Sequence, residues 1–290
     1  MNANFVIMGL PASGKTTFLA ALWHLVESAE TDCRLVMDSY RGDFTYLNSI
    51  ADAWRNFQKI PRTSQTGDTE VTIYLHDRET NARGTALFPD LAGEIFDLQV
   101  EERRCRPEFI KQADAEDGIL FFINANVKED GLSIVDYNSR LPPEFRSSDL
   151  PELGDVTTSV AMPEWEPKFL PAQVRIVQLL SDLIRAPFTY RSRKLALLIS
   201  AWDLARDQGH TPDQWLALNM PLVHQFFRAN GKSFTSRVYG VSAQGINLDD
   251  DAAVDVAADM IPSRRIQIVG HDDGEHDLTA PLVWLMSAEE

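Results

Sequence analysis

Cysteine and long apolar runs are scarce in this chain of 290 residues. Its two cysteines, Cys33 and Cys105, are too few for a disulfide scaffold and fit a reducing cytoplasm. No apolar run is long enough to span a bilayer. The first residues lead directly into an apolar, strand-like segment, which is not the pattern of a signal peptide. The sequence therefore predicts a cytoplasmic protein without a membrane span.

Positive charge is scarce as well. The chain has 27 Lys and Arg residues against 43 Asp and Glu residues, which gives a formal net charge of −16. An acidic chain is repelled by nucleic-acid phosphates and by anionic lipids, so we expect no direct binding to nucleic acid. The densest basic group is Arg103, Arg104 and Arg106, which we interpret as a solvated helix face or a contact with a partner.

A phosphate-binding motif opens the chain. The stretch from Gly9 to Thr16 matches the P-loop pattern G-x-x-x-x-G-K-[ST] at every fixed position. An apolar, strand-like run at 5–8 precedes it, and a helical pattern at 17–26 follows it. Gly9 and Gly14 lack a Cβ, so the backbone can curl around an anion, and the helix N-terminus then points at the phosphates.

The loop residues have separate expected roles. Lys15 reaches the β and γ phosphates, and the Thr16 hydroxyl ligates Mg²⁺, a hard cation that takes oxygen ligands. The nucleotide-binding residues expected from this part of the chain are Gly9, Pro11, Ala12, Ser13, Gly14, Lys15, Thr16 and Thr17.

Strand-like and helix-like runs alternate along the rest of the chain. Apolar runs typical of buried parallel strands lie at 118–124, 195–200 and 237–241. Two shorter runs at 71–76 and 85–88, joined by a short polar link, predict an antiparallel hairpin. Helical patterns fit at 43–57, 171–184, 212–229 and 278–286. This order predicts an α/β fold with a mostly parallel sheet, helices on both faces and one antiparallel hairpin strand.

Two segments interrupt the alternation, at about 127–168 and 244–275. Both are polar or acidic, and we interpret them as insertions rather than separate domains. The prediction is a single P-loop domain over residues 1–290.

Three further motifs follow at the expected ends of strands. The first, residues 88–94, contains Asp90 and Gly93, which would hold Mg²⁺ and approach the γ-phosphate. The second, residues 200–203, ends in Asp203, whose carboxylate can accept two hydrogen bonds from the guanine edge, an option that adenine does not offer. The third begins at Ser242 and continues with Ala243, whose free N–H could meet the guanine O6.

With these motifs in this order, the chain resembles the GTPases of the translation-factor-related (TRAFAC) class. The segments GLPASGKTTFLAALW, DLAGE and HDLTAPLVWL are similar to a narrower group, the bacterial double-GTPase-type proteins, which are associated with biological-conflict systems. The resemblance implies binding of GTP and GDP with Mg²⁺, hydrolysis of GTP, and a protein partner that reads the switch loops at 61–69 and 91–106. It also implies a switch threonine that joins Mg²⁺ only in the GTP state. Thr66 is the preferred candidate, with Thr63 and Thr69 as alternatives.

Two positions depart from the pattern of the class. The guanine motif is usually N/T-K-x-D, and here Ser200 begins it and no lysine follows, so Trp202 either packs on the base or belongs to the core. A glutamine often follows DxxG, and here the residue is Glu94, whose charge faces the γ-phosphate. We therefore expect hydrolysis that is slow without a partner, with Lys15, Glu94 and Thr66 as the catalytic residues. Arg62 is either an arginine finger supplied by the same chain or an ordinary loop residue.

Two other functions remain open. The first is a nucleotide-holding adaptor that hydrolyses little. The second is a P-loop ATPase or kinase, in which Asp203 would be incidental.

Overall fold

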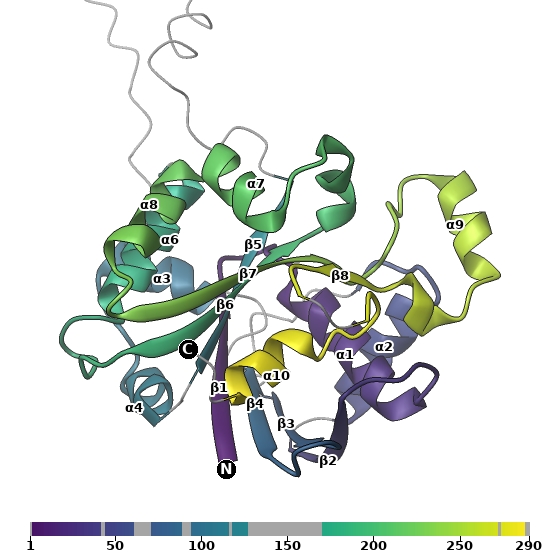
Figure 1. Cartoon of the computed structure of the whole chain (residues 1–290), viewed down its shortest axis with the longest axis horizontal. Helices are drawn as coiled ribbons and strands as arrows, with labels where there is room; N and C mark the ends of the chain where they lie inside the picture. The colour runs from purple at the N-terminus through teal and green to yellow at the C-terminus, as the bar shows by residue number, and fades with distance from the viewer. Residues whose placement is uncertain are drawn as a thin grey trace, which may run out of the picture.

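The computed structural model describes residues 2–41, 44–60, 71–88, 94–115, 118–126, 170–271 and 274–287. Within them the chain forms one eight-stranded sheet with the order β2-β3-β4-β1-β5-β6-β7-β8 (Figure 1). The strands are β1 (Asn2–Gly9), β2 (Leu35–Arg41), β3 (Val71–Asp77), β4 (Arg83–Phe88), β5 (Gly118–Asn124), β6 (Arg193–Ser200), β7 (Phe234–Ser242) and β8 (Gln267–Val269).

The five inner strands, from β4 to β7, run parallel, whereas β2, β3 and β8 pair antiparallel with their neighbours. The predicted α/β fold with a parallel sheet is therefore confirmed, and so is the hairpin of β3 and β4. At one edge of the sheet, β8 pairs with the end of β7.

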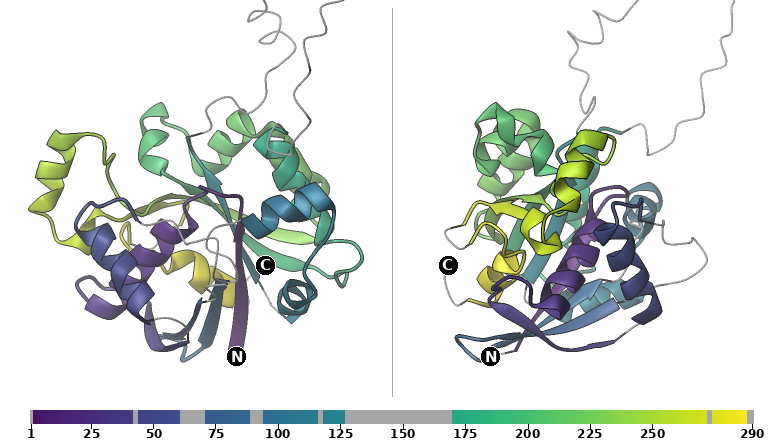
Figure 2. Two further views of the ribbon diagram at one scale, coloured as in Figure 1. Left: turned by 180° about the vertical axis from the view of Figure 1, so that it is seen from behind. Right: turned by 90° about the vertical axis from the view of Figure 1, so that its right-hand side faces the viewer.

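Helices cover both faces of the sheet (Figures 1 and 2). Alternate residues of β1 enter different cores: Phe5 and Ile7 pack with α1, α2 and α10, whereas Val6 and Met8 pack with α3, α4, α6, α7 and α8. The helices are α1 (Lys15–Ser28), α2 (Phe44–Arg55), α3 (Glu94–Glu102), α4 (Pro107–Ala115), α6 (Ala172–Asp182), α7 (Pro212–Asn219), α8 (Pro221–Ala229), α9 (Asp251–Ala258) and α10 (Ala280–Met286).

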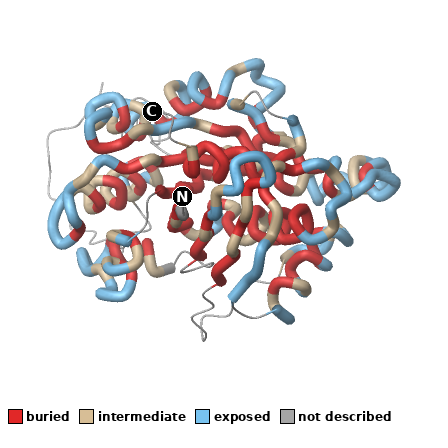
Figure 3. Tube along the Cα trace, turned by 60° about the horizontal axis from the view of Figure 1, so that its bottom comes forward, coloured by how far each residue is buried: buried red, intermediate tan, exposed pale blue. Residues whose placement is uncertain are grey.

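Burial follows this layered arrangement. The tube in Figure 3 is buried along the central strands and exposed at the outer turns. In the part of the chain that the structure describes, no helix has both the length and the apolar character needed to cross a membrane.

Two local expectations need correction. The single helix expected at 212–229 is two helices, because Pro221 has no N–H to continue the first one past Met220. The loop expected at 91–106 is in large part helical, since α3 occupies Glu94–Glu102. The segment at 244–275 supplies β8 and the buried residues Ile266 and Ile268 of one core.

Candidate functional site

The P-loop lies at the centre of the sheet, where β1 ends and α1 begins. A cavity of about 570 Å³ opens beside it, lined by the loop and by residues at the carboxyl ends of β5, β6 and β7. This volume falls within the range of roughly 300–1,000 Å³ that is typical of ligand sites. The carboxyl ends of parallel strands are where open α/β sheets bind their ligands.

Two glycines in the loop have no room for a side chain. A Cβ on Gly9 would lie 2.6 Å from the Ser13 Oγ and 2.9 Å from the backbone oxygen of Phe122. A Cβ on Gly14 would lie 2.6 Å from the Ser200 side chain, and Gly14 also has a φ of +95°, which is the left-handed region. The curled loop that the sequence predicted is therefore present, and close contacts with β5 and β6 help to fix it.

Lys15 is folded into this loop. Its side chain is buried, and its ammonium Nζ donates hydrogen bonds to the backbone oxygens of Gly9 (2.8 Å) and Leu10 (3.0 Å) and to the Ser13 Oγ (3.5 Å). A buried ammonium needs such partners because its desolvation is costly. The loop thus holds a positive charge directly beside the cavity, as the binding of a phosphate requires.

Two side chains from neighbouring strands brace the loop. Ser200, at the end of β6, donates a hydrogen bond of 2.8 Å to the backbone oxygen of Ser13. Asn124, at the end of β5, donates one of 2.9 Å through its Nδ2 to the backbone oxygen of Ala12, which has a φ of +58°. Ser200 therefore couples the predicted guanine motif to the phosphate loop.

Asp203 is half-buried and held in one orientation. Its backbone N–H donates to the Ser242 Oγ at 2.8 Å, and the Ser242 hydroxyl in turn donates to Asp203 Oδ1. Because Ser242 is buried at the end of β7, the carboxylate is positioned by the adjacent strand. Asp203 lines the same cavity as the P-loop, so the two predicted halves of the site come together.

Trp202 belongs to the core and not to the cavity. Its side chain is buried, lies edge-on to Trp215 at 6.4 Å between ring centroids, and fills the space beside Gly240. Of the two roles considered for Trp202, the structure supports the core role. The apolar side chains that line the cavity include those of Leu204 and Leu248, which are 48% and 36% exposed.

The end of α2 is tied to the loop that follows β7. The buried Trp54 donates a hydrogen bond of 2.9 Å from Nε1 to the backbone oxygen of Ala243, and Gln244 Nε2 donates one of 3.3 Å to the backbone oxygen of Trp54. Residues 58–60, just beyond α2, also line the cavity. The segment that leads toward 61–69 is thus anchored at the predicted base end of the site.

Most of the predicted site residues lie in this one place. The cavity lining includes Pro11, Ala12, Ser13, Gly14, Lys15, Thr16, Thr17, Ser200, Asp203 and Ala243. Gly9 bonds to Lys15, and Ser242 bonds to Asp203, so both belong to the same site.

The remaining predicted residues are not tested by these contacts. Asp90, Gly93, Arg62 and the three switch candidates Thr63, Thr66 and Thr69 lie outside the described residues. Glu94 begins α3, but its side chain also lies outside the described part.

Sequence reasoning missed several cavity residues. Asn124 had a usable signal, since it ends a predicted parallel strand beside the P-loop, as Ser200 does. Leu248 and residues 58–60 carry no local signal, because they reach the cavity only through the tertiary fold.

Comparison of the sequence with models of known protein families identifies one family. The model of the family described as "Double-GTPase 1" matches residues 6–285. Among curated proteins, none matches this chain.

Two solved structures resemble this chain in the path of the backbone. One is the Ski7 GTPase-like domain of S. cerevisiae, bound to GDP and inorganic phosphate, with 12% identity, a TM-score of 0.42, and coverage of 84% of this chain and 43% of that one. The other is a point variant of Era from Aquifex aeolicus bound to GDP.AlF4-, with 14% identity, a TM-score of 0.34, and coverage of 88% and 56%. This chain therefore spans less than two thirds of the length of either.

Proposed function

This chain belongs to the Double-GTPase 1 family, and we propose that it binds GTP and GDP and hydrolyses GTP as a nucleotide-dependent switch. The observation that carries the proposal is the position of Asp203. Its carboxylate is oriented by Ser242, lies in the same cavity as the P-loop, and belongs to a motif that Ser200 joins to that loop. A carboxylate fixed in this way can accept hydrogen bonds from the N1–H and N2–H₂ groups of guanine.

The phosphates would bind at the other end of the cavity. The backbone N–H groups of the loop and the start of α1 supply a site with positive polarity, and Lys15 adds a full positive charge. In the proposed bound state, Lys15 turns from the oxygens of Gly9 and Leu10 toward the β and γ phosphates.

The base would rest against apolar surface. Leu204 and Leu248 both line the cavity and leave apolar surface exposed there. In this proposal they take over the packing role of the lysine that the guanine motif lacks.

Hydrolysis would be an in-line attack of water on the γ-phosphate. Mg²⁺, when bound, neutralises charge that develops on the phosphate oxygens. The Thr16 hydroxyl and the Asp90 carboxylate are oxygen donors of the kind that Mg²⁺ takes, with Thr66 as the proposed third ligand from the switch. Glu94 would orient the water, and Gly93 would let a backbone N–H approach the γ-phosphate. A role in bacterial defence stays a prediction of the family resemblance.

Phosphate release tests this proposal directly. The purified chain is incubated with GTP and Mg²⁺, and inorganic phosphate is followed for the wild type, Lys15→Ala and the matched control Lys111→Ala, which changes an exposed lysine of α4. We expect release by the wild type and the control and its loss in Lys15→Ala. GTP binding without release above the level of Lys15→Ala would make the chain a nucleotide-holding adaptor instead.

A further inference from the structure

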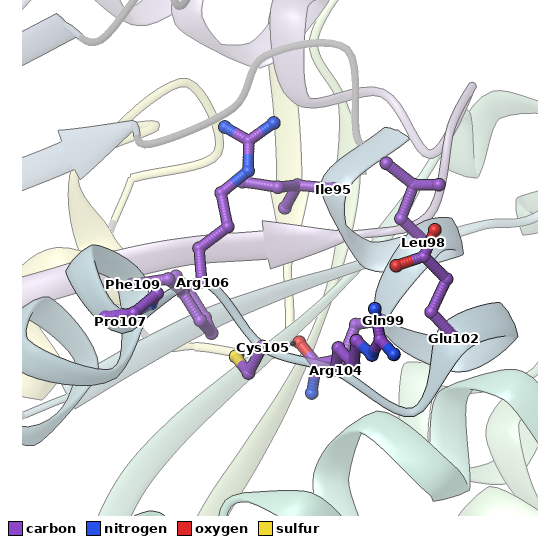
Figure 4. A pocket seen from close by; sticks show the side chains of 9 residues that line it. All are labelled: Ile95, Leu98, Gln99, Glu102, Arg104, Cys105, Arg106, Pro107 and Phe109. Atoms are coloured by element: carbon purple, nitrogen blue, oxygen red, sulfur yellow. Dashed lines mark hydrogen bonds between the residues drawn. The ribbon is translucent and has the colours of Figure 1, made fainter.

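Two surface features outside the nucleotide cavity differ in their place in the fold. The first is a cavity of about 280 Å³ between α3 and α4, whose lining includes Leu98, Cys105 and Phe109 (Figure 4). Much of it belongs to the predicted switch segment at 91–106, for which a partner is already expected. The second is α9 (Asp251–Ala258), which lies at the margin of the molecule beyond the β8 edge of the sheet (Figures 1 and 2). This helix belongs to neither of the predicted switch loops.

Helix α9 turns apolar side chains toward solvent. All its residues are described, and only Ala257 among them is buried. Val256 is 71% exposed, and Met260, one turn further on, is 44% exposed. The helical turn reaches Met260, whose N–H donates a hydrogen bond of 3.1 Å to the oxygen of Ala257. Because residues four apart share one face of a helix, Ala252, Val256 and Met260 form an exposed apolar stripe, whereas a surface helix usually turns such a stripe to the core.

An acidic stripe runs beside the apolar one. Asp251, Asp255 and Asp259 are exposed and are again four apart. Asp259 follows Val256 by three residues, a spacing that makes two helix residues neighbours. In the part of the chain that the structure describes, none of these three carboxylates forms a salt bridge. The apolar stripe is therefore bordered by negative charge that the described fold does not pair.

Basic residues are few in this part of the sequence. The chain has five aspartates from 249 to 259 and no Lys or Arg from 244 to 263. The next residue, Arg264, is exposed and supplies a single positive charge. Arg265 is buried, lies over the ring of Trp54 at 4.8 Å and donates a hydrogen bond to the backbone oxygen of Arg55. Its charge is thus directed to the end of α2 and away from solvent.

The charges of α9 also oppose the stability of the helix. Carboxylates at positions i and i+4 repel one another, and the C-terminus of a helix carries the negative end of its dipole. Asp255 and Asp259 lie near that end, and the last turn has no basic residue. A cation supplied from outside α9 would relieve both effects. Positions that break a local rule with no compensating gain in the fold are expected at functional sites.

From these observations we propose that α9 is the docking site for a partner protein that presents a basic, amphipathic segment. An apolar side chain of that segment packs on Val256 and Met260, and its Lys or Arg side chains pair with Asp251, Asp255 and Asp259. Anionic lipid and nucleic acid are repelled by these carboxylates. A two-fold pairing of α9 with its own copy would bring like charges together. A basic protein segment is the occupant that the charge favours.

A peptide selection with depletion tests this site. A random peptide library displayed on phage is selected on the full chain in the presence of GDP and depleted on the double variant Asp255→Lys with Val256→Ser. We expect a surviving consensus in which Lys and Arg flank one or two large apolar residues. The synthesised peptide should bind about tenfold or more weakly to each single variant than to the wild type. Its binding should also weaken as the salt concentration is raised.

Two matched controls change exposed residues elsewhere. Leu218→Ser removes an exposed apolar side chain of α7, and Glu101→Lys reverses an exposed charge in the predicted switch segment. Both variants should keep full binding. Because α9 lies outside the predicted switch loops, the GDP form and the form with the slowly hydrolysed analogue GTPγS should bind the peptide equally.

Several results would overturn the docking proposal. They are the survival of no sequence after depletion, a consensus that is acidic or uncharged, and binding that requires GTPγS and is lost in Glu101→Lys. A concentration-dependent dimer in sedimentation velocity that disappears in Asp255→Lys would assign this face to a second copy of the chain instead. GTP binding is measured on the same proteins, and its absence from the wild type would refute the proposed function and leave the docking site standing.

Discussion

Replacing Ser200 with alanine separates the two roles that its position suggests. Its hydroxyl donates a hydrogen bond of 2.8 Å to the backbone oxygen of Ser13 in the P-loop. Ser200 also opens the motif that ends in Asp203, the residue proposed to read the base. Because alanine keeps the Cβ that lies against Gly14, Ser200→Ala removes the hydrogen bond and leaves the local packing in place.

The expected magnitude follows from the burial of the bond. Both Ser200 and Ser13 are buried, so the variant leaves the Ser13 oxygen without this partner at a site with little exposure to solvent. Such a loss costs about 1–3 kcal/mol. Since about 1.4 kcal/mol corresponds to a factor of ten, the affinity for GTP should fall by about 5-fold to about 150-fold if the cost is expressed in binding.

Isothermal titration with GTP, GDP, ATP and inorganic tripolyphosphate measures this effect. We expect all four ligands to weaken by a similar factor, because the bond holds the phosphate loop, and the ratio of GTP to ATP affinity to stay constant. Ser181→Ala is the matched control, since it removes a side chain to backbone hydrogen bond within α6, outside the cavity lining. A loss of preference for GTP over ATP with unchanged binding of tripolyphosphate would refute this reasoning.

Three further predictions concern the same fold. The pKa of Asp77 is raised by burial but lowered more by its hydrogen bonds, first from Arg34, to about 2. The carboxylate therefore adds about 2 kcal/mol to the free energy of unfolding above about pH 4, and this contribution is lost as the pH falls toward 2. Urea titrations at several pH values should show this loss of stability in the wild type and not in Asp77→Asn. Trp54→Phe removes the bond to the Ala243 oxygen and should weaken GTP and GDP about fivefold, but not tripolyphosphate, in the same titrations. Burial raises the pKa of the Cys105 thiol to about 11, so alkylation by iodoacetamide at pH 8 should be slow in the folded chain and fast in urea.

The sequence predicted those parts of the molecule whose signals are local. The strand, loop and helix from Asn2 to Ser28 are recognisable because a fixed motif sits between two apolar patterns. The buried strands β5 and β6 are recognisable as uninterrupted apolar runs. Pro221 is a local signal for the break between α7 and α8, but the apolar pattern that continues beyond it favours a single helix.

The remaining features depend on contacts between distant parts of the chain. The bond from Trp54 to Ala243 joins residues 189 positions apart, and no local pattern indicates it. The sequence indicates a strand-like piece at 265–269, but the place of β8 at the edge of the sheet is fixed by pairing with β7. Helices α3 and α4 are both short, and the sequence indicated a switch loop at 91–106 and no element at 107–115.

The most direct test of the proposed function is the nucleotide preference of Asp203→Asn. The wild type and the variant are titrated with GTP, ATP and xanthosine triphosphate in the presence of Mg²⁺. If Asp203 reads the base, the wild type prefers GTP to ATP, and the variant loses that preference and gains affinity for the xanthine nucleotide, whose edge suits an amide. If the wild type binds ATP as well as GTP and the variant changes neither, Asp203 does not read the base, and the guanine-nucleotide switch proposed here is wrong.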